Sequence, residues 1–523
     1  DPPVPVGQAE DDHVDTEPEP DLEPESDGAP SSAAEGSPRW DARLVTVAER
    51  LDHPMVGVVG ITLAVAAYVA YMTQRTLDVH HGLGTSAYDL GLYDQGVWLM
   101  SRFRTPFVTL MGRNLFGDHA SFILLLVVPL YWVVPGVGTL LFLQALAIGL
   151  GAVPVFLYAR RRLDSGLLAL VCGLVYLLHP AVGWTNLENF HPDSFLAVFV
   201  GFAIYFALTE QWRLYLSFVL LSMMVKEDVS LVLVPLGFWV AAKRNRDIGL
   251  STVFVSIGFT LMGMYLVMRS LIGVPTRNGW RIPFGGPKGL LKTAVREPGK
   301  LFDHLRADDR PWYLWQMTAP FAWTFVRAPS VALIGSIVLF TNVLSTFVYQ
   351  YLISYHYSLI VVPCLGLGAV HGLGAMGTRW RRPAVTAMAL MGLWTAYLWG
   401  PFGVDSIAGY VWRPSNPVAV GLRAIITEIP DDAVISVYHS AAPHVDHRTD
   451  VYMFPNPFRV VLYGPDTSLE GQRLAIADQV EYVLLPTART PETEADWQVI
   501  TGEFELVDQA VGWELFRRID GTG

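Results

Sequence analysis

The sequence predicts an all-helical, polytopic membrane protein that ends in a small α/β domain. Three observations support this fold class. The 523 residues are 52% hydrophobic and 16% charged, with a mean hydropathy of +0.36, which is typical of polytopic membrane proteins. Uncharged apolar runs long enough to cross a bilayer recur through residues 53–404. These runs stop after that point, so residues 405–523 are expected to fold as a separate domain.

Residues 1–52 form the most acidic part of the chain. Residues 1–37 contain twelve Asp or Glu and no Lys or Arg, among many Pro, Ser, Gly and Ala. Such a composition cannot bury enough apolar surface to offset the entropy of ordering, so we expect a disordered acidic tail. The tail accounts for the whole net charge of −12. The acidic balance therefore says nothing about the substrate, and we expect no nucleic-acid partner.

Apolar runs in residues 53–404 predict about eleven membrane crossings. The first run, residues 54–73, has twenty residues without a charge, which is the length that a helix needs to cross the hydrocarbon core. The further runs lie near residues 138–159, 166–182, 193–209, 214–225, 229–242, 248–272, 313–326, 330–347, 356–376 and 384–401.

Short loops rich in Arg and Lys occur at alternate positions between these runs. They are residues 160–162, 210–213 and 243–246, Arg327, and residues 379–382. Because cytoplasmic loops are enriched in these residues, all of them can lie in the cytoplasm together. This orientation places the acidic tail in the cytoplasm of a plasma-membrane protein. The first loop, residues 74–137, and the C-terminal domain are then extracytoplasmic.

Two apolar stretches break the simple pattern. Residues 121–136 contain two prolines and span only about 16 residues, so we interpret them as a re-entrant or interfacial element. In residues 213–244, Lys226, Glu227 and Asp228 lie in the middle of an otherwise apolar run. One continuous helix would bury three charges at mid-bilayer and reverse every later loop, so we predict two short helices that meet at these charges.

With this topology, the unusual polar residues gather on the extracytoplasmic side. This is the strongest functional signal in the sequence, because unrelated polar residues would be divided between the two faces. The set comprises Asp89, Asp94, Asp118, His119, Glu188, His191, Lys226, Glu227, Asp228, Arg277, Arg281 and His356.

Asp89 and Asp94 lie in the segment "SAYDLGLYDQGVW", just after the first span. They are five residues apart and do not share one face of a regular helix, so they could be two solvated loop acids. The aromatic residues Tyr88, Tyr93 and Trp98 indicate instead an amphipathic element at the membrane surface. A partly desolvated carboxylate in that position is suited to act as a general base.

The other polar residues also allow two interpretations. A lone His is more often structural than a ligand, but His119 with Asp94 and Asp118 could hold Mg²⁺, Mn²⁺ or Ca²⁺. Lys226 could pair with its own acidic neighbours, yet ionisable groups near a membrane are costly and usually functional. Arg277 and Arg281 could bind a phosphate, or contact anionic lipid.

Residues 405–523 read as an α/β domain on the extracytoplasmic side. Strands are predicted at residues 433–438, 450–454, 481–486 and 513–519, with helices near residues 417–428 and 469–478. The histidines of "YHSAAPHVDHR" could be metal ligands, but a polar loop is favoured. The domain is expected to cap the site or to contact an acceptor.

Several segments together resemble a family of bacterial membrane proteins known as domain of unknown function 2079. They are "YDLGLYDQGVW", "NLFGDHASFILLLVVPLYWVVPG", "NFHPDSF", "VKEDVS" and "YHYSLIVVP". That family resembles in turn the GT-C superfamily of polytopic glycosyltransferases. The resemblance implies a GT-C-like transmembrane domain over residues 53–404. It also implies transfer of a sugar from a polyprenyl-phosphate donor to a glycan, lipid or protein acceptor of the cell envelope.

The resemblance also implies roles for particular residues. GT-C enzymes place a catalytic acid shortly after span one, often followed four residues later by Tyr, and Asp89 with Tyr93 fits this pattern. Asp94 is the second candidate for the catalytic acid. Many relatives have Asp-Glu where this chain has Asp89-Leu90, which leaves the need for a divalent cation open.

Two other functions fit the same sequence. A transporter or flippase of a lipid-linked or small polar substrate would place its binding groups near the bilayer midplane, between repeated halves of the chain. A non-catalytic membrane scaffold would use residues 405–523 as its binding module.

Overall fold

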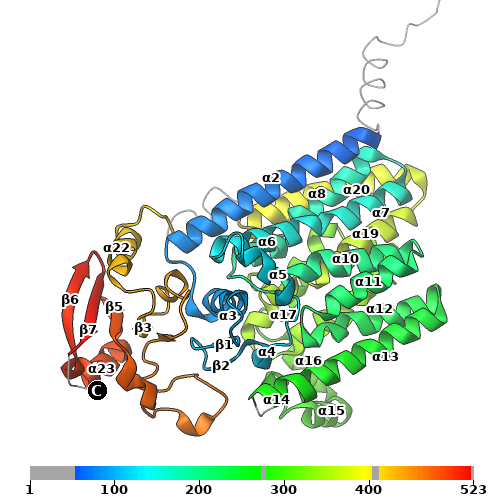
Figure 1. Ribbon diagram of the computed structural model, residues 1–523. Coiled ribbons are helices and arrows are strands. Elements are labelled where there is room, and N and C mark those ends of the chain that lie inside the picture. Colours follow the sequence, from blue (N-terminus) through cyan, green and yellow to red (C-terminus); the bar gives the residue numbers. More distant parts are fainter. Residues whose placement is uncertain (1–53, 273–277, 403–411, 520–523) are drawn as a thin grey trace, which may run out of the picture. The chain divides into compact units, whose positions relative to one another are not determined.

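The computed structural model describes residues 54–272, 278–402 and 412–519. The predicted acidic tail and Arg277 lie outside these described residues. Figure 1 shows a bundle of helices in the first part of the described chain and a sheet with flanking helices in the last part.

The helices of the bundle correspond to the apolar runs of the sequence. The uncharged run 54–73 forms most of α2, and α6 and α7 together make the apolar segment Val137–Leu163. Helix α13 begins where the Asn245 side chain accepts a hydrogen bond from the Ile248 N–H at 3.0 Å. The bundle helices are α2 (Pro54–His81), α6 (Val137–Leu150), α7 (Ala152–Leu163), α8 (Gly166–Leu177), α9 (Pro180–Leu187), α10 (Ser194–Leu208), α11 (Trp212–Met223), α12 (Ser230–Lys243), α13 (Arg246–Met262), α17 (Arg310–Thr318), α18 (Ser336–Leu344), α19 (Val361–Gly374) and α20 (Thr378–Trp399).

Four helical segments in the described residues are long and apolar enough to cross a membrane. They are Met55–His81, Val137–Leu163, Arg246–Ile272 and His356–Gly374, and the pair α8–α9, bent by 47°, makes a fifth if it counts as one span. Other apolar runs form shorter helices, so the figure of about eleven crossings stays a prediction. The structure is nevertheless that of a multi-pass membrane protein.

Both of the unusual apolar stretches fold as short elements. Residues 121–136 contain α5 (Leu124–Tyr131), which has Pro129 inside it and is too short to cross a bilayer. The run 213–244 is divided into α11 and α12 by a 3-10 turn at Glu227–Val229, as predicted from its three charges.

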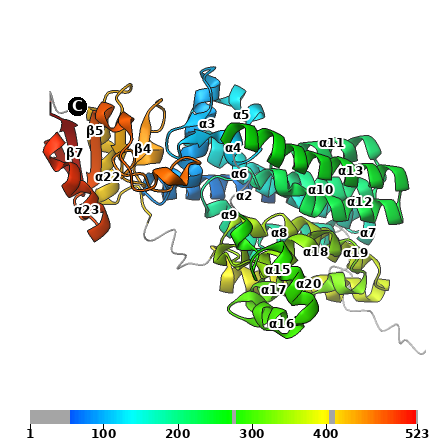
Figure 2. The same ribbon diagram turned by 90° about the horizontal axis from the view of Figure 1, so that it is seen from below.

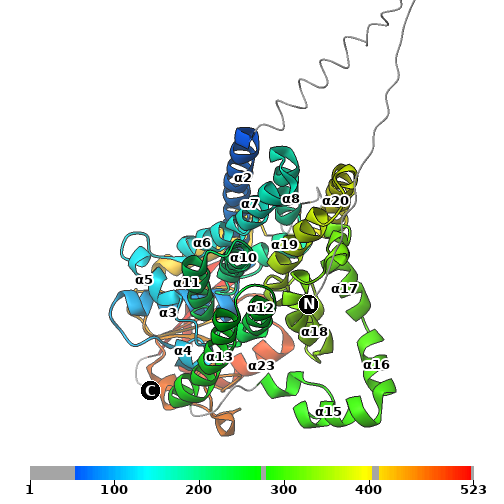
Figure 3. The ribbon, with the colours of Figure 1, turned by 90° about the vertical axis from the view of Figure 1, so that its right-hand side faces the viewer.

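The first loop and a later connection carry the remaining short elements. The first loop contains a π-helical turn η1 (Ala87–Gly91), α3 (Leu92–Ser101), β1 (Phe107–Val108), β2 (Arg113–Asn114) and α4 (Leu115–Asp118). The connection between α13 and α17 contains α14 (Arg269–Ile272), α15 (Pro287–Arg296) and α16 (Pro298–Arg306). In Figure 3, α15 and α16 form an arm at the edge of the bundle.

The last part of the chain forms a five-stranded mixed sheet with strand order β4-β3-β5-β7-β6. The strands β3, β4 and β5 are parallel, and β7 pairs antiparallel with both β5 and β6. The elements are α22 (Pro417–Ile425), β3 (Ile435–Val437), β4 (Val451–Met453), β5 (Tyr482–Pro486), α23 (Pro491–Ile500), β6 (Phe504–Ala510) and β7 (Trp513–Arg518). Figure 2 shows them grouped together near α3.

Loops that follow β3 and β4 contact the first loop directly. Gln95 of α3 donates hydrogen bonds to the carbonyl oxygens of Arg448 and Thr449 at 3.2 and 3.3 Å, and the Thr109 hydroxyl donates to the Val451 carbonyl at 2.8 Å. These contacts lie at the amino end of β4. The loops after the carboxyl ends of β3 and β4 supply the His439 and Leu462 carbonyl oxygens, which accept hydrogen bonds from the Ala87 N–H and the Tyr88 hydroxyl.

Candidate active site

A cavity of about 830 Å³ lies where the first loop meets the ends of several bundle helices. Its lining brings together nine of the twelve residues that the sequence and the resemblance single out for catalysis or substrate binding. The nine are Asp89, Tyr93, His119, His191, Lys226, Glu227, Asp228, Arg281 and His356.

Three predicted residues do not line this cavity. Arg277 lies outside the described residues. Glu188 lies behind the lining, where its carboxylate accepts the His356 backbone N–H at 2.7 Å. Asp94 is 1% exposed and accepts a hydrogen bond from the Tyr131 hydroxyl, so it is separated from the cavity that Asp89 lines.

The predicted metal set of Asp94, Asp118 and His119 is likewise not brought together. Asp118 pairs with Arg113 at 3.0 Å, and His119 Nδ1 lies 2.9 Å from Glu227 Oε1. Because Asp94 belongs to a different cluster, these three residues do not form one ligand set in the structure.

Asp89 has a strained backbone conformation within the turn η1, with φ 67° and ψ −86°. Such a conformation costs a non-glycine residue about 1–3 kcal/mol and persists only where surrounding contacts hold it. Here the Ala87 N–H donates to the His439 carbonyl at 2.8 Å, and the Tyr88 hydroxyl donates to the Leu462 carbonyl at 2.9 Å. Loops of the C-terminal sheet therefore hold the turn that presents Asp89 to the cavity.

His191 is the direct partner of Asp89, with 3.3 Å between its Nε2 and the carboxylate Oδ1. The ring is oriented from behind, because Nδ1 lies 2.8 Å from the Asn189 carbonyl oxygen. The backbone N–H of His191 donates to Gln144 Oε1 at 3.0 Å, which fixes the loop to α6. Hydrogen bonds to neighbouring parts of the chain thus hold both the loop that carries His191 and the turn that carries Asp89.

The Asp89–His191 pair is ionic at neutral pH. Burial lowers the pKa of His191, but the negative charges of Asp89 and Glu188 outweigh burial and raise it to about 9. Burial also raises the pKa of Asp89, but His191 outweighs it and brings the pKa below the ordinary value of 3.8. The Asp89 side chain keeps 42% of its surface exposed, and that surface faces the cavity.

The raised pKa of His191 predicts how stability changes with pH. Because the folded-state pKa exceeds the ordinary value of 6.5, the pair stabilises the fold fully below pH 6.5 and loses this contribution as pH rises through about 9. We expect the Tm of the wild type to fall across this window, relative to that of His191→Gln. The exposed His439→Gln should follow the wild type. Parallel curves for wild type and His191→Gln would contradict an ionic pair.

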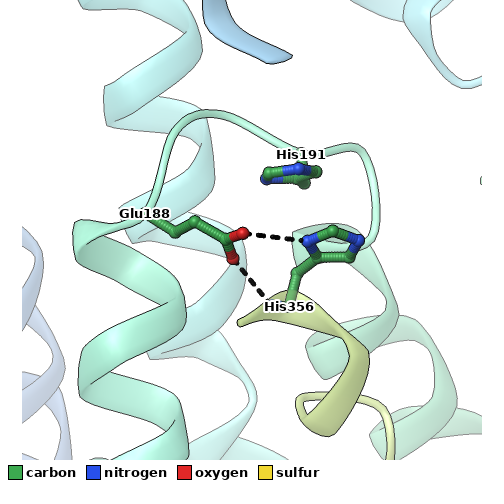
Figure 4. Close-up of side chains that lie close together, drawn as sticks. All are labelled: Glu188, His191 and His356. Carbon is green, nitrogen blue, oxygen red and sulfur yellow. Dashed lines mark hydrogen bonds and ion pairs between the residues drawn. The ribbon is translucent and has the colours of Figure 1, made fainter. Parts of the chain in front are cut away.

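A second layer supports His191 from below (Figure 4). The His191 and His356 rings stack with centroids 3.7 Å apart, and His356 Nδ1 lies 3.2 Å from Glu188 Oε1. One ligand atom from each of Glu188, His191 and His356 lies within 4.8 Å of the others, so this group could hold a metal ion by distance. In the structure these atoms already partner one another and Asp89, so the group is satisfied without an ion.

Lys226 supplies a buried positive charge at the break between α11 and α12. Its Nζ lies 3.3 and 3.4 Å from the two carboxylate oxygens of Asp193, and the residue is 6% exposed. Burial lowers the pKa of Lys226, but Asp193 and the neighbouring acids outweigh it and raise the pKa well above 10.5. The ammonium group is therefore charged at every physiological pH.

Arg281 supplies a second positive charge, and this one has no acidic partner among the described residues. Its guanidinium lies 4.3 Å from the Phe347 ring centroid and 5.7 Å from that of Tyr357. The Nε atom is buried and has no hydrogen-bond acceptor in the described chain. An anion in the cavity would satisfy this donor.

His119 and Glu227 join the first loop to the same break. Glu227 accepts from the Ala120 N–H at 3.1 Å, and its carbonyl accepts from the Thr260 hydroxyl at 2.6 Å. Burial raises the pKa of Glu227, but His119 outweighs it and lowers the pKa to about 2. Burial lowers the pKa of His119, whereas Glu227 raises it to a net value above the ordinary 6.5. Both pKa shifts indicate that His119 and Glu227 form a second ion pair.

One wall of the cavity is apolar and comes from the arm and from neighbouring elements of the bundle. Arg281 comes directly before the wall residue Ile282 in the chain. The amphipathic helix α15 follows and supplies Leu290 and Leu291. A chain of methyl-branched hydrocarbon could lie along such a wall. The wall includes Met264, Ile282, Leu290, Leu291, Leu301, Phe340 and Leu344.

Three residues at the site, Asp193, Arg113 and Tyr357, were not predicted from the sequence. Asp193 lies in the segment "NFHPDSF", two residues after His191. Arg113 and Tyr357 carry no local signal, because each reaches the cavity only through the fold.

Comparisons with known proteins agree with this architecture. A family model described as predicted membrane protein (DUF2079) matches residues 79–521. ArnT from Cupriavidus metallidurans has a similar fold in its apo state, with a TM-score of 0.53 and 14% identity over 89% of this chain and 99% of that chain. Its structure bound to undecaprenyl phosphate has a TM-score of 0.50 and 13% identity over 88% and 98% of the two chains. A search of curated proteins finds no match.

Proposed function

Because the chain belongs to the DUF2079 family of predicted membrane proteins and has a GT-C-like fold, we propose that it is an integral membrane glycosyltransferase. The proposed donor is a sugar carried on a polyprenyl phosphate, and the proposed acceptor is a glycan, lipid or protein of the cell envelope. The reaction takes place at the extracytoplasmic face.

The observation that supports this proposal is the composition of one cavity. It combines a carboxylate held in a strained turn, the buried ammonium of Lys226 and the Arg281 guanidinium, which has no acidic partner among the described residues, beside an apolar wall. A lipid-phosphate sugar needs these same elements: a base for the acceptor, positive charge for the phosphate and a hydrocarbon surface for the tail. ArnT, which shares the fold, has been crystallised with undecaprenyl phosphate.

In the proposed reaction, the acceptor hydroxyl oxygen attacks the anomeric carbon and forms the new glycosidic bond. The bond between this carbon and the phosphate oxygen breaks, and the lipid phosphate leaves with the electron pair. Asp89 accepts the hydroxyl proton, while Arg281 and Lys226 stabilise the charge on the phosphate. Because the phosphate is a good leaving group, its bond to the anomeric carbon can break before the acceptor hydroxyl loses its proton. A carboxylate of low pKa is then a strong enough base to accept that proton.

The proposed activity can be tested with the full chain in lipid nanodiscs. Polyprenyl-phosphate donors with radiolabelled pentose, hexose or amino sugars would be incubated with an envelope extract. We expect label to leave the lipid fraction, either in a glycosylated acceptor or, more slowly, as free sugar from hydrolysis. Donors that stay intact in nanodiscs but cross the bilayer of sealed vesicles would contradict the proposal and identify a flippase.

A further inference from the structure

Outside the cavity, three side chains meet between α3 and the loop after β3. Asp94 comes from α3, and Asp446 and His447 come from the loop. One carboxylate oxygen or ring nitrogen from each of the three lies within 4.8 Å of the others, and His447 Nε2 is 3.1 Å from Asp94 Oδ2. None of the three lines the cavity that contains Asp89.

The charges in this cluster do not balance. Asp94 and Asp446 are 1% and 2% exposed, and the single imidazole of His447 faces both of them. Asp446 Oδ2 is fully buried and accepts no hydrogen bond from any residue that the structure describes.

We propose that Asp94, Asp446 and His447 bind a divalent transition-metal cation of the Zn²⁺ or Mn²⁺ class. Two carboxylate oxygens and one imidazole nitrogen are a common ligand set for such ions, with water completing the coordination. At bond lengths of about 2.0–2.2 Å, tetrahedral ligands lie about 3.3–3.6 Å apart, so atoms that lie within 4.8 Å of one another can close on an ion by shifts of about 1 Å.

Neighbouring side chains hold these ligands in place. The Tyr131 hydroxyl donates to Asp94 Oδ1 at 2.5 Å, which leaves Oδ2 for the ion. The Trp98 ring stacks on the His447 ring with centroids 5.7 Å apart. Such outer contacts orient metal ligands and are usual around metal sites.

The ion would fasten the C-terminal sheet to the first loop. Asp94 lies five residues after Asp89, and the loop with Asp446 also supplies the His439 carbonyl that holds the turn η1. The ion would therefore link these two parts of the chain, and its binding does not depend on the proposed transferase activity.

The test uses purified full-length chain in detergent, stripped with a chelator and then titrated with Zn²⁺ or Mn²⁺. Bound metal is measured by elemental analysis and stability by Tm. Asp446→Asn and His447→Gln remove one ligand each. Asp432→Asn and His439→Gln are matched controls, because both residues are exposed and lie outside the cluster.

We expect the wild type and both controls to bind one more equivalent of metal than Asp446→Asn and His447→Gln. Their Tm should rise by at least about 3 °C on metal addition, whereas the two ligand variants should not respond. Equal metal content in all five proteins would overturn the proposal. If metal does not change the Tm of the wild type and Asp446→Asn has a higher Tm than the wild type, the proposal is wrong. Asp94 and Asp446 then share a proton in place of a metal ion. If Asp446→Asn does not fold, the comparison of metal binding by the wild type and by His447→Gln, a change at a partly exposed residue, still tests the proposal.

Discussion

Replacing Asp89 with Asn is expected to lower the turnover of sugar transfer by about 10²–10⁴-fold, which is the usual contribution of a general base. The substitution keeps the shape of the side chain but removes its ability to accept the acceptor proton. Donor binding should change little, because Lys226 and Arg281 are the residues proposed to bind the phosphate. The measurement is single-turnover transfer from a radiolabelled donor, with donor affinity measured separately.

Asp118→Asn is the matched control for this experiment. Asp118 lines the same cavity, but its carboxylate is paired with Arg113, so we expect less than about a tenfold change. If Asp118→Asn abolishes transfer and Asp89→Asn does not, the base has been assigned to the wrong carboxylate.

Lys226→Met is expected to have the second large effect, on stability and activity together. The substitution leaves the Asp193 carboxylate buried without its cation, which costs about 3–5 kcal/mol in the free energy of unfolding. It also removes one of the two charges that hold the donor phosphate. Denaturant unfolding and a donor-binding assay would measure the two effects.

The double variant Lys226→Met/Asp193→Asn separates these effects. With both charges removed, most of the lost stability should return, because no unpaired charge remains. Donor binding should stay weak, because the ammonium is still absent. Lys288→Met, which removes an exposed lysine of α15, should match the wild type in stability. Recovery of donor binding in the double variant would show that Lys226 serves only to pair with Asp193.

Much of the helical architecture could be predicted from the sequence, because uncharged apolar runs have few alternatives to helices in a membrane. The break at Glu227–Val229 was predictable for the same reason, since a continuous helix would have buried three charges. Strands β3, β4, β5 and β7 lie within or beside the predicted segments. Strand β6 was missed because it lies at the sheet edge and is largely exposed, so it has no clear apolar signal.

The convergence of the polar residues could also be predicted, but their pairing could not. Loop parity places Asp89, His191 and Lys226 on one side of the membrane, and the structure brings them into one cavity. Spacing alone could not separate Asp89 from Asp94, because the direction of each side chain depends on the irregular turn η1. Asp94 pairs with His447, which lies 353 residues later in the sequence, so no local sequence pattern could predict this contact.

The central claim is that the cavity with Asp89 binds a polyprenyl-phosphate sugar. The most direct test is an experimental structure of the full chain with a non-hydrolysable polyprenyl-phosphate sugar analogue. We expect phosphate density within contact of Arg281 and Lys226, with the anomeric carbon facing Asp89 and the tail on the α15 side. Lipid-phosphate density elsewhere, with no ligand in this cavity, would contradict it.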